Sequence, residues 1–289
     1  MNSKKVLLDT DIGTDIDDAV CLAYLLSQPD CDLQGITTVT GEAKKRAQLA
    51  STICKVAGQD IPIFPGAEKP IIVEQQQKIA QQAQNLNNWE YKESFPEGEA
   101  VEFMRKTIRA HPGEISLLTV GPLTNVGLLF RVDPKIPSLL KELVMMSGVF
   151  TGNVGAREWN AIGDPQATAI VFAQNVGLKR VVGLDVTTQV RMKAEQVRKE
   201  FTSELLEPVK DFAEIWFQER DELTFHDPLA AATLFDDEIC SYKKGEIEVE
   251  LLSERRKGAT YLDLDENGSH QVALDVNRER FFDHFFSVF

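Results

Sequence analysis

Five aspartates lie within ten residues near the start of the chain, directly after the short apolar run at residues 6–8. They are Asp9, Asp11, Asp15, Asp17 and Asp18. Neighbouring carboxylates cannot all be ionised without a cation, and hard divalent ions take all-oxygen sites of this kind. Capping of the helix expected after them would explain one aspartate but not five. The spacing therefore predicts a metal site.

The elements that must position these carboxylates alternate between strand and helix. The acidic stretch follows a buried strand, and in open α/β sheets ligands bind beyond the carboxyl ends of the strands. Helices are expected at residues 18–27 and 42–57, and strands at residues 33–40 and 62–64. This β-α-β-α-β order predicts a parallel sheet covered by helices.

The remaining chain continues the mixed pattern, with no internal repeat and no linker rich in Pro, Gly or Ser. We therefore expect one α/β domain over residues 1–289, with a mostly parallel, Rossmann-like central sheet flanked by helices. A surface helix is expected at residues 75–84, and residues 194–220 should form one or two helices broken near Pro208. Further strands are expected at residues 115–120, 142–146, 179–184, 247–252, 258–263 and 270–274, and helices at 99–110, 123–130, 164–173 and 280–289.

Composition narrows the classes of partner. The 289 residues carry a net charge of −14, which argues against nucleic acid or an anionic membrane as the main partner, because both require a basic surface. A small neutral substrate stays compatible with this charge. No signal peptide is evident, and no apolar run approaches the roughly 18 residues of a membrane span. The four cysteines follow no zinc or redox spacing. We expect a cytoplasmic protein.

Two other acidic patterns carry weaker hypotheses. Residues 263–268 begin like a calcium-binding EF-hand loop, but the twelfth position is Leu274 rather than a glutamate. A hairpin turn is the simpler interpretation. Asp9 and Asp11 also resemble the catalytic pair of haloacid-dehalogenase-type phosphatases, although Gly13 stands where those enzymes have Thr or Val. That phosphatase class is kept as an alternative enzyme.

Four further polar segments fall at expected strand ends or helix starts, so a parallel sheet can bring them to one rim. They are TVGPLTN (119–125), REWNAIGDPQA (157–167), GLDVT (183–187) and HDPLA (226–230). Together with the acidic stretch, they resemble the inosine–uridine-preferring nucleoside hydrolase family. The resemblance implies the nucleoside hydrolase fold. It also implies hydrolysis of the N-glycosidic bond of a ribonucleoside or related ribosyl compound, giving free base and ribose.

The family's opening motif, D-x-D-x-G-x-D-D, aligns with DTDIGTDIDD at residues 9–18, with two extra residues in the loop. We align the final Asp pair with Asp17 and Asp18, because a helix should begin directly after them. The resemblance then implies a Ca²⁺ ion and a general base, Asp11, acting on a metal-bound water. The implied metal ligands are Asp11, Asp18, Asp227 and the backbone carbonyl of Val120.

The same resemblance implies a substrate site. Trp159 stands where the family has Phe, and His226 matches a histidine that donates a proton to the leaving group in some members. The implied substrate-binding residues are Asp17, Glu42, Asn153, Glu158, Trp159, Asn160 and His226. Two departures from the family pattern affect substrate recognition. Glu42 replaces a usual Asn that touches sugar hydroxyls and adds a charge near the ribose, and residues 71–78 lack the family's His-Gly loop, which changes what lies over the base. A nucleoside or another ribosyl compound therefore stays open as the substrate.

The residue types suit this chemistry on their own account. Cleavage of an N-glycosidic bond passes through an oxocarbenium-like state that carboxylates stabilise, and direct attack by one water predicts inversion at the anomeric carbon. The alternative from another class is a non-catalytic, Ca²⁺-dependent sugar or nucleoside binder.

Asp164 is expected to cap a helix, and Asp185 to support the site from behind. Family members are commonly dimers or tetramers, so a homodimer or homotetramer is expected.

Overall fold

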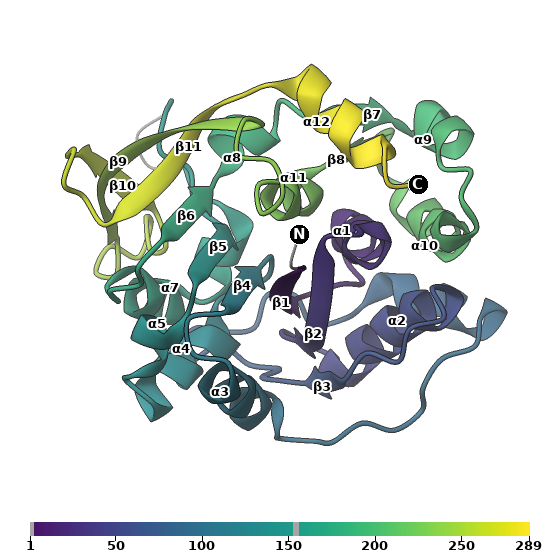
Figure 1. Ribbon diagram of the computed structural model, residues 1–289, viewed down its shortest axis with the longest axis horizontal. Helices are drawn as coiled ribbons and strands as arrows, with labels where there is room; N and C mark the ends of the chain where they lie inside the picture. The colour runs from purple at the N-terminus through teal and green to yellow at the C-terminus, as the bar shows by residue number, and fades with distance from the viewer. Residues whose placement is uncertain (1–2, 153–155) are drawn as a thin grey trace.

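A nine-stranded sheet forms the centre of the molecule in the computed structural model, which describes residues 3–152 and 156–289 (Figure 1). Every neighbouring pair from β3 to β11 is parallel, whereas β9 runs antiparallel to both of its neighbours. This confirms the predicted α/β class and its mostly parallel sheet. The strands in sheet order are β10 (Thr260–Leu264), β9 (Cys240–Val249), β11 (His270–Val276), β6 (Lys179–Val182), β5 (Glu142–Met146), β4 (Ile115–Thr119), β1 (Lys4–Thr10), β2 (Cys31–Thr38) and β3 (Ile63–Pro65).

Strand β1 lies where the order of the sheet reverses. The chain leaves β1 toward β2 and β3 at one edge, and then returns to β4 on the other side of β1. The loops after β1 and β4 therefore diverge and leave a crevice beyond their carboxyl ends, the usual place for a ligand in such sheets. The acidic stretch follows β1 directly.

Alternating side chains on the strands build one core on each face of the sheet. Val6 and Leu8 of β1 point into one core, and Leu7 points into the other, as the two-residue period of a strand requires. The first face is covered by α1 (Asp17–Ser27), α2 (Ala43–Val56), α8 (Leu184–Thr187), α9 (Ala194–Glu200), η2 (Glu204–Leu206), α10 (Glu207–Trp216), α11 (His226–Ala232) and α12 (Arg278–Phe286). The second face is covered by α3 (Ala100–Ala110), α4 (Thr124–Val132), α5 (Ile136–Leu139) and α7 (Pro165–Phe172), and the short α6 (Trp159–Gly163) precedes α7.

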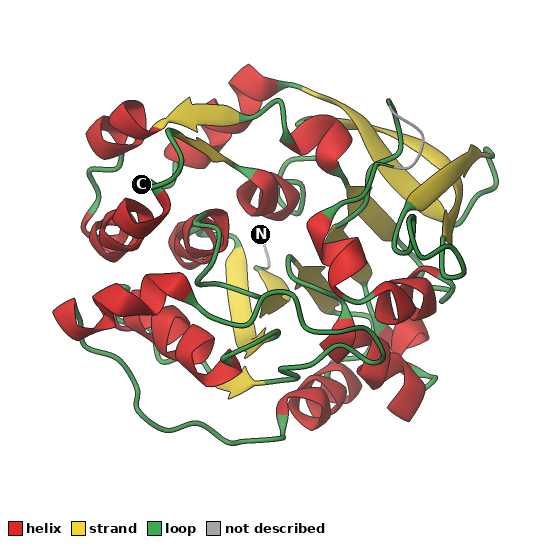
Figure 2. Cartoon of the chain, turned by 180° about the vertical axis from the view of Figure 1, so that it is seen from behind, coloured by secondary structure: helices red, strands yellow, loops and turns green. Residues whose placement is uncertain are grey.

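Several expected boundaries change in the structure. Residues 75–80 form a loop, and a 3₁₀ helix, η1 (Gln81–Asn88), follows in place of the expected surface helix. Pro208 lies in the first turn of α10, where its missing N–H costs nothing, so the break between α9 and α10 falls before it. A separate two-stranded sheet, β7 (Arg191–Lys193) with β8 (Glu222–Thr224), was not predicted; it lies outside the main sheet (Figure 2).

The expected hairpin between the last two strands is wrong. Strands β10 and β11 both pair with β9, which lies between them, so the turn at residues 265–269 crosses over β9. The crossing point is Gly245, and a Cβ added to Gly268 would lie 2.5 Å from the Gly245 Cα. Two glycines allow this close passage. Asp265 accepts a hydrogen bond from the Asn267 backbone in that turn, as in an Asx turn.

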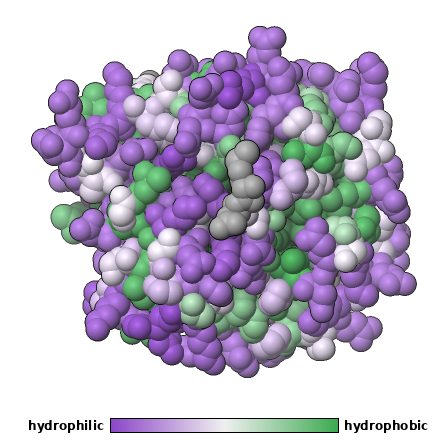
Figure 3. Space-filling view, in the orientation of Figure 1, coloured by the Kyte–Doolittle hydropathy of each residue, from purple (hydrophilic) through white to green (hydrophobic). Residues whose placement is uncertain are grey.

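The surface agrees with the composition. The face drawn in Figure 3 is dominated by hydrophilic residues with smaller apolar areas between them, in keeping with the net charge of −14. Among the helices of the described residues, none has the length and apolarity needed to cross a membrane.

Aromatic packing at the C-terminus joins the helices that follow the acidic stretch. Phe285 of α12 stacks on Tyr24 of α1, with ring centroids 5.7 Å apart, and lies edge-on to Phe225, at 5.4 Å. The Tyr24 hydroxyl is also hydrogen-bonded to Nε2 of His284 at 2.6 Å. Tyr24 lies in the second half of α1 and Phe225 immediately precedes α11, so helix α12 packs against the end of α1 and the start of α11 (Figure 1).

We expect Phe285→Ala to lower the free energy of unfolding by about 3–5 kcal/mol, because the fully buried ring leaves a cavity between three elements. Urea denaturation followed by circular dichroism measures this change. Asp283→Ala, at an exposed position of the same helix, is the control and should be nearly neutral. An equal loss in both variants would contradict the role given to the aromatic cluster.

Candidate active site

A cavity of about 460 Å³ opens beyond the carboxyl ends of β1 and β4, at the reversal point of the sheet. Its walls come from the acidic loop, the loop before η1, the start of α6, the end of α10 and the start of α11. The lining residues are Asp11, Thr14, Asp15, Asp17, Asp18, Gln77, Val120, Met146, Arg157, Glu158, Trp159, Asn160, Ile162, Leu184, Trp216, Arg220, His226 and Asp227.

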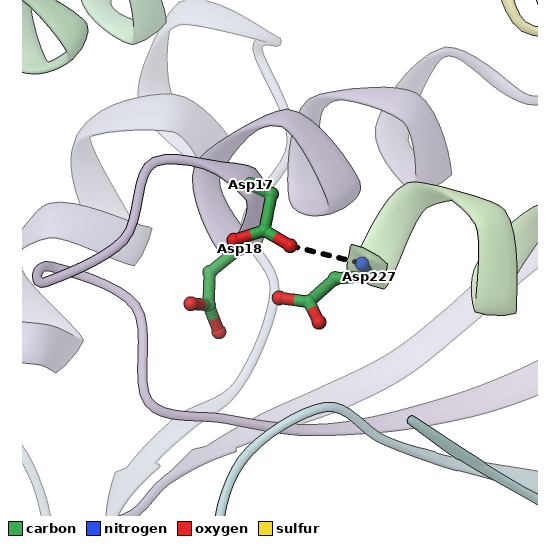
Figure 4. A group of neighbouring side chains, drawn as sticks. All are labelled: Asp17, Asp18 and Asp227. Atoms are coloured by element: carbon green, nitrogen blue, oxygen red, sulfur yellow. Dashed lines mark hydrogen bonds between the residues drawn. The ribbon is translucent and has the colours of Figure 1, made fainter. Parts of the chain in front are cut away.

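Three buried aspartates meet at the start of two helices. Asp17 and Asp18 open α1, and Asp227 lies in the first turn of α11. One carboxylate oxygen of each lies within 4.8 Å of the others. The Asp227 backbone N–H donates to Oδ2 of Asp17 at 3.0 Å, which locks the two helix starts together (Figure 4). Residues 210 positions apart thus share one acidic centre.

Burial raises the pKa of Asp17, Asp18 and Asp227 well above the usual value, and the negative charges of the neighbouring aspartates raise these values further. The helix N-termini offset only part of this cost. Three converging carboxylates form the oxygen-only donor set that hard divalent cations prefer. The residues present therefore fit a divalent cation.

Asp11 lies in the same cavity and is held from two sides. Its Oδ2 accepts a hydrogen bond from Nε2 of Gln77 at 2.8 Å. The buried Arg46 guanidinium donates to the Asp11 backbone carbonyl and, at 3.1 Å, to that of Ile12. Burial raises the Asp11 pKa, whereas the Arg46 charge and the Gln77 hydrogen bond lower it. Arg46 is thus a buried cation directly behind the acidic loop.

Glu158 and Asn160 form the opposite wall. The Glu158 carboxylate accepts backbone hydrogen bonds from Gly148 at 3.0 Å, Asn160 at 2.6 Å and Ala161 at 2.8 Å, and so caps α6. Burial raises the Glu158 pKa to about 7 although these three donors lower it. The Asn160 amide donates to the Val120 carbonyl at 2.8 Å. A carbonyl oxygen has two lone pairs, so Val120 keeps one for another partner.

His226 lies beside the acidic centre at the start of α11. Its Nδ1 is 2.7 Å from the Thr187 hydroxyl. Burial, together with the positive charge of Arg191, lowers the pKa of His226 to about 4, so the ring is neutral at neutral pH. Nearby, Arg220 lies over the ring of Trp216, 5.3 Å from its centroid.

The structure brings most of the predicted residues to this cavity, though in a changed grouping. Asp17, expected at the substrate, stands with Asp18 and Asp227 in the tightest carboxylate group, while Asp11 lies beside them. The residues gathered as predicted along the cavity are Asp11, Asp17, Asp18, Val120, Glu158, Trp159, Asn160, His226 and Asp227.

Of the other two predicted substrate residues, one is placed elsewhere and the other is not described. Glu42 does not line the cavity, because its backbone is left-handed (φ 61°) and its carboxylate bonds to Lys45 Nζ at 2.6 Å and the Ala80 N–H at 2.9 Å. Asn153 lies outside the described residues. Sequence reasoning also missed Gln77 and Arg46, since neither has a local pattern that marks it out.

Two further aspartates fix backbone near the site, and the expected helix cap at Asp164 is present. Asp164 caps α7 by accepting from the Ala167 N–H at 3.0 Å. Its other oxygen accepts from the Thr124 hydroxyl at 2.8 Å. Asp185 accepts from the backbone of Phe150 and Thr151, which fixes the loop that follows β5.

Comparison with known proteins agrees with this geometry. Residues 6–283 match the family model described as inosine-uridine preferring nucleoside hydrolase. Uridine nucleosidase 1 of Arabidopsis thaliana is 30% identical over 270 residues, covering 86% of this chain and 78% of that protein. The inosine-uridine preferring nucleoside hydrolase of Leishmania major is 30% identical and covers 96% and 95%. A solved plant nucleoside hydrolase superposes with a TM-score of 0.83 at 26% identity over 99% of this chain and 98% of its own.

The fold and cavity are therefore those of a hydrolase acting on N-glycosyl compounds. The chain belongs to the inosine-uridine preferring nucleoside hydrolase family. This membership replaces the phosphatase alternative suggested by Asp9 and Asp11.

We expect Asp17→Asn to stabilise the protein by about 1 kcal/mol in the presence of a chelator, because it removes one of several mutually repelling buried charges. The Asn carbonyl can still accept from the Asp227 N–H. Thermal unfolding in excess EDTA measures the change, with the exposed Asp30→Asn as the matched control. A lower unfolding temperature for Asp17→Asn than for the wild type would contradict the repulsion argument.

Proposed function

We propose that this protein catalyses Ca²⁺-dependent hydrolysis of the N-glycosidic bond of a ribonucleoside or closely related ribosyl compound. The observation that carries the proposal is the convergence of Asp18 and Asp227 with Asp11 in one cavity. The fit of that oxygen-rich centre to a hard cation supports Ca²⁺. Nucleoside substrates named for the relatives, such as uridine and inosine, are the first candidates.

In this proposal, the cation would be held by four groups: the carboxylates of Asp11, Asp18 and Asp227 and the backbone carbonyl of Val120. When bound, the cation supplies a positive charge that offsets the carboxylates and makes nearby water more acidic. Asp11 accepts the proton of the attacking water as the water adds to the anomeric carbon. The bond to the base breaks without a covalent intermediate, so the configuration at that carbon inverts.

The remaining cavity residues act on the sugar and the leaving group. Asp17, Glu158 and Asn160 hold ribose hydroxyls, and the carboxylates of Asp17 and Glu158 stabilise the oxocarbenium-like state. His226, neutral at pH 7 because its pKa is about 4, serves the leaving group through a ring N–H rather than as an imidazolium. Trp159 forms the exposed edge of the sugar site; it is 49% exposed.

A non-catalytic Ca²⁺-dependent nucleoside binder is the contrasting function, since residues 71–78 lack the family's His-Gly loop.

We also propose a cytoplasmic homodimer or homotetramer, in line with the family resemblance. Light scattering coupled to gel filtration tests the assembly.

We expect the wild-type protein to release free ribose from at least one of uridine, inosine and nicotinamide riboside, and EDTA to abolish the release. Added CaCl₂ should restore it, because the cation offsets the buried carboxylates. Reducing-sugar assays measure the product. 2′-Deoxyuridine, which lacks one hydroxyl for the sugar-binding groups, is the comparison substrate and should react more slowly. Tight binding of a riboside without any release would favour the binder.

We expect Asp11→Asn to lower kcat by roughly two to four orders of magnitude, since the amide cannot accept the proton of the attacking water. Ribose release under saturating substrate measures the effect. Asp60→Asn, an exposed change of the same kind, should leave kcat unaltered, and thermal unfolding should show that both variants are folded. Full turnover by folded Asp11→Asn would refute the assignment of the base.

A further inference from the structure

The side-chain amide of Gln77 spans the cavity from one wall to the other. Its Nε2 donates to Oδ2 of Asp11 at 2.8 Å and to the Thr14 hydroxyl at 2.7 Å. Its Oε1 accepts from the indole N–H of Trp159 at 2.6 Å. Both amide hydrogens and the oxygen are therefore used, and the side chain is only 7% exposed. An amide satisfied in this way has one orientation.

The Asp11 end of this amide determines which carboxylate oxygen is available. Gln77 donates its hydrogen bond to Oδ2 of Asp11. The other oxygen, Oδ1, lies beside Gly121, where a Cβ added to the glycine would be 2.8 Å from Oδ1. A donor on one oxygen fixes the plane of the carboxylate and leaves the other oxygen to receive a proton.

The Trp159 end determines the width of the cavity. Trp159 is the first residue of α6 and lies between Glu158 and Asn160. Those two neighbours are buried, whereas the Trp159 ring is 49% exposed and is tied to the opposite wall through Gln77. Gln77 thus connects the acidic loop to the wall proposed to hold the sugar.

The loop that carries Gln77 is itself fixed against the acidic loop. The Gln82 amide donates to the carbonyls of Thr14 at 3.2 Å and Asp15 at 2.8 Å in the acidic loop. Arg46 donates to the Ile79 carbonyl at 3.3 Å as well as to the acidic loop. The segment that follows Gln77 is therefore anchored to the acidic loop, and this supports the Gln77 amide in its position against Asp11.

We propose that Gln77 is a positioning residue with two separable effects. It orients Asp11 as the proton acceptor, which affects kcat, and it holds Trp159 against the substrate site, which affects KM. The proposal rests on the function proposed above, because it takes Asp11 to be the base.

Three variants separate the two ends. Gln77→Glu keeps an acceptor for Trp159 but loses the donor to Asp11, and should lower kcat roughly ten- to hundred-fold with little change in KM. Trp159→Phe keeps the donor to Asp11 and should raise KM while kcat stays within about twofold. Gln77→Ala should show both effects. Gln76→Ala, an exposed glutamine next in the chain, is the matched control and should change neither.

Tryptophan fluorescence provides a readout that does not depend on turnover. Gln77→Ala should increase the quenching of Trp159 by acrylamide, and this increase should vanish in the Gln77→Ala/Trp159→Phe double variant. Unchanged quenching in Gln77→Ala would overturn the Trp159 half of the proposal. Kinetic constants of Gln77→Glu equal to those of Gln76→Ala would overturn the Asp11 half. Absence of ribose release by the wild type would instead defeat the proposed function, and the quenching result would still decide whether Gln77 holds Trp159.

Discussion

Repulsion among buried carboxylates is the constraint on which the rest of this structure depends. Asp17, Asp18 and Asp227 are almost fully buried and lie within 4.8 Å of one another, and a folded chain does not hold such charges together without compensation. The helix N-termini and the Thr10 hydroxyl, which donates to Asp18 at 2.5 Å, provide part of it. The unmet remainder means that the centre could accommodate a cation, which a structural ion pair would not require.

Apolar packing around α1, α11 and α12 provides the stabilising free energy that keeps the buried carboxylates together. Apolar side chains of α1 and α11 are buried against the sheet and against each other, and the aromatic rings of α12 close over both helices. Arg46 holds the acidic loop from behind through backbone carbonyls. The favourable free energy of core packing thus offsets the unfavourable free energy of the buried carboxylates. Such a trade-off between stability and activity is common at functional sites.

The parts of the structure that could be predicted from the sequence are those with local signals. The alternation of strands and helices, the helix cap at Asp164 and the run of aspartates after a buried strand all depend on neighbours in the chain, and the structure has them as expected. Features formed by distant segments were missed or misplaced. Gln77 stands among other glutamines, Arg46 resembles a solvated residue of an amphipathic helix, and the passage of residues 265–269 over Gly245 depends on a strand that the turn does not join.

The placement of α12 has a consequence for how the protein matures on the ribosome. The two halves of the acidic centre are 210 residues apart, and the final helix seals the helices that carry them. Synthesis proceeds from the N-terminus, so the aspartates of the first loop emerge long before their partner helix and its aromatic cover. The nascent chain therefore cannot complete the acidic centre before α11 has left the ribosome, and the centre lacks its aromatic cover until α12 follows.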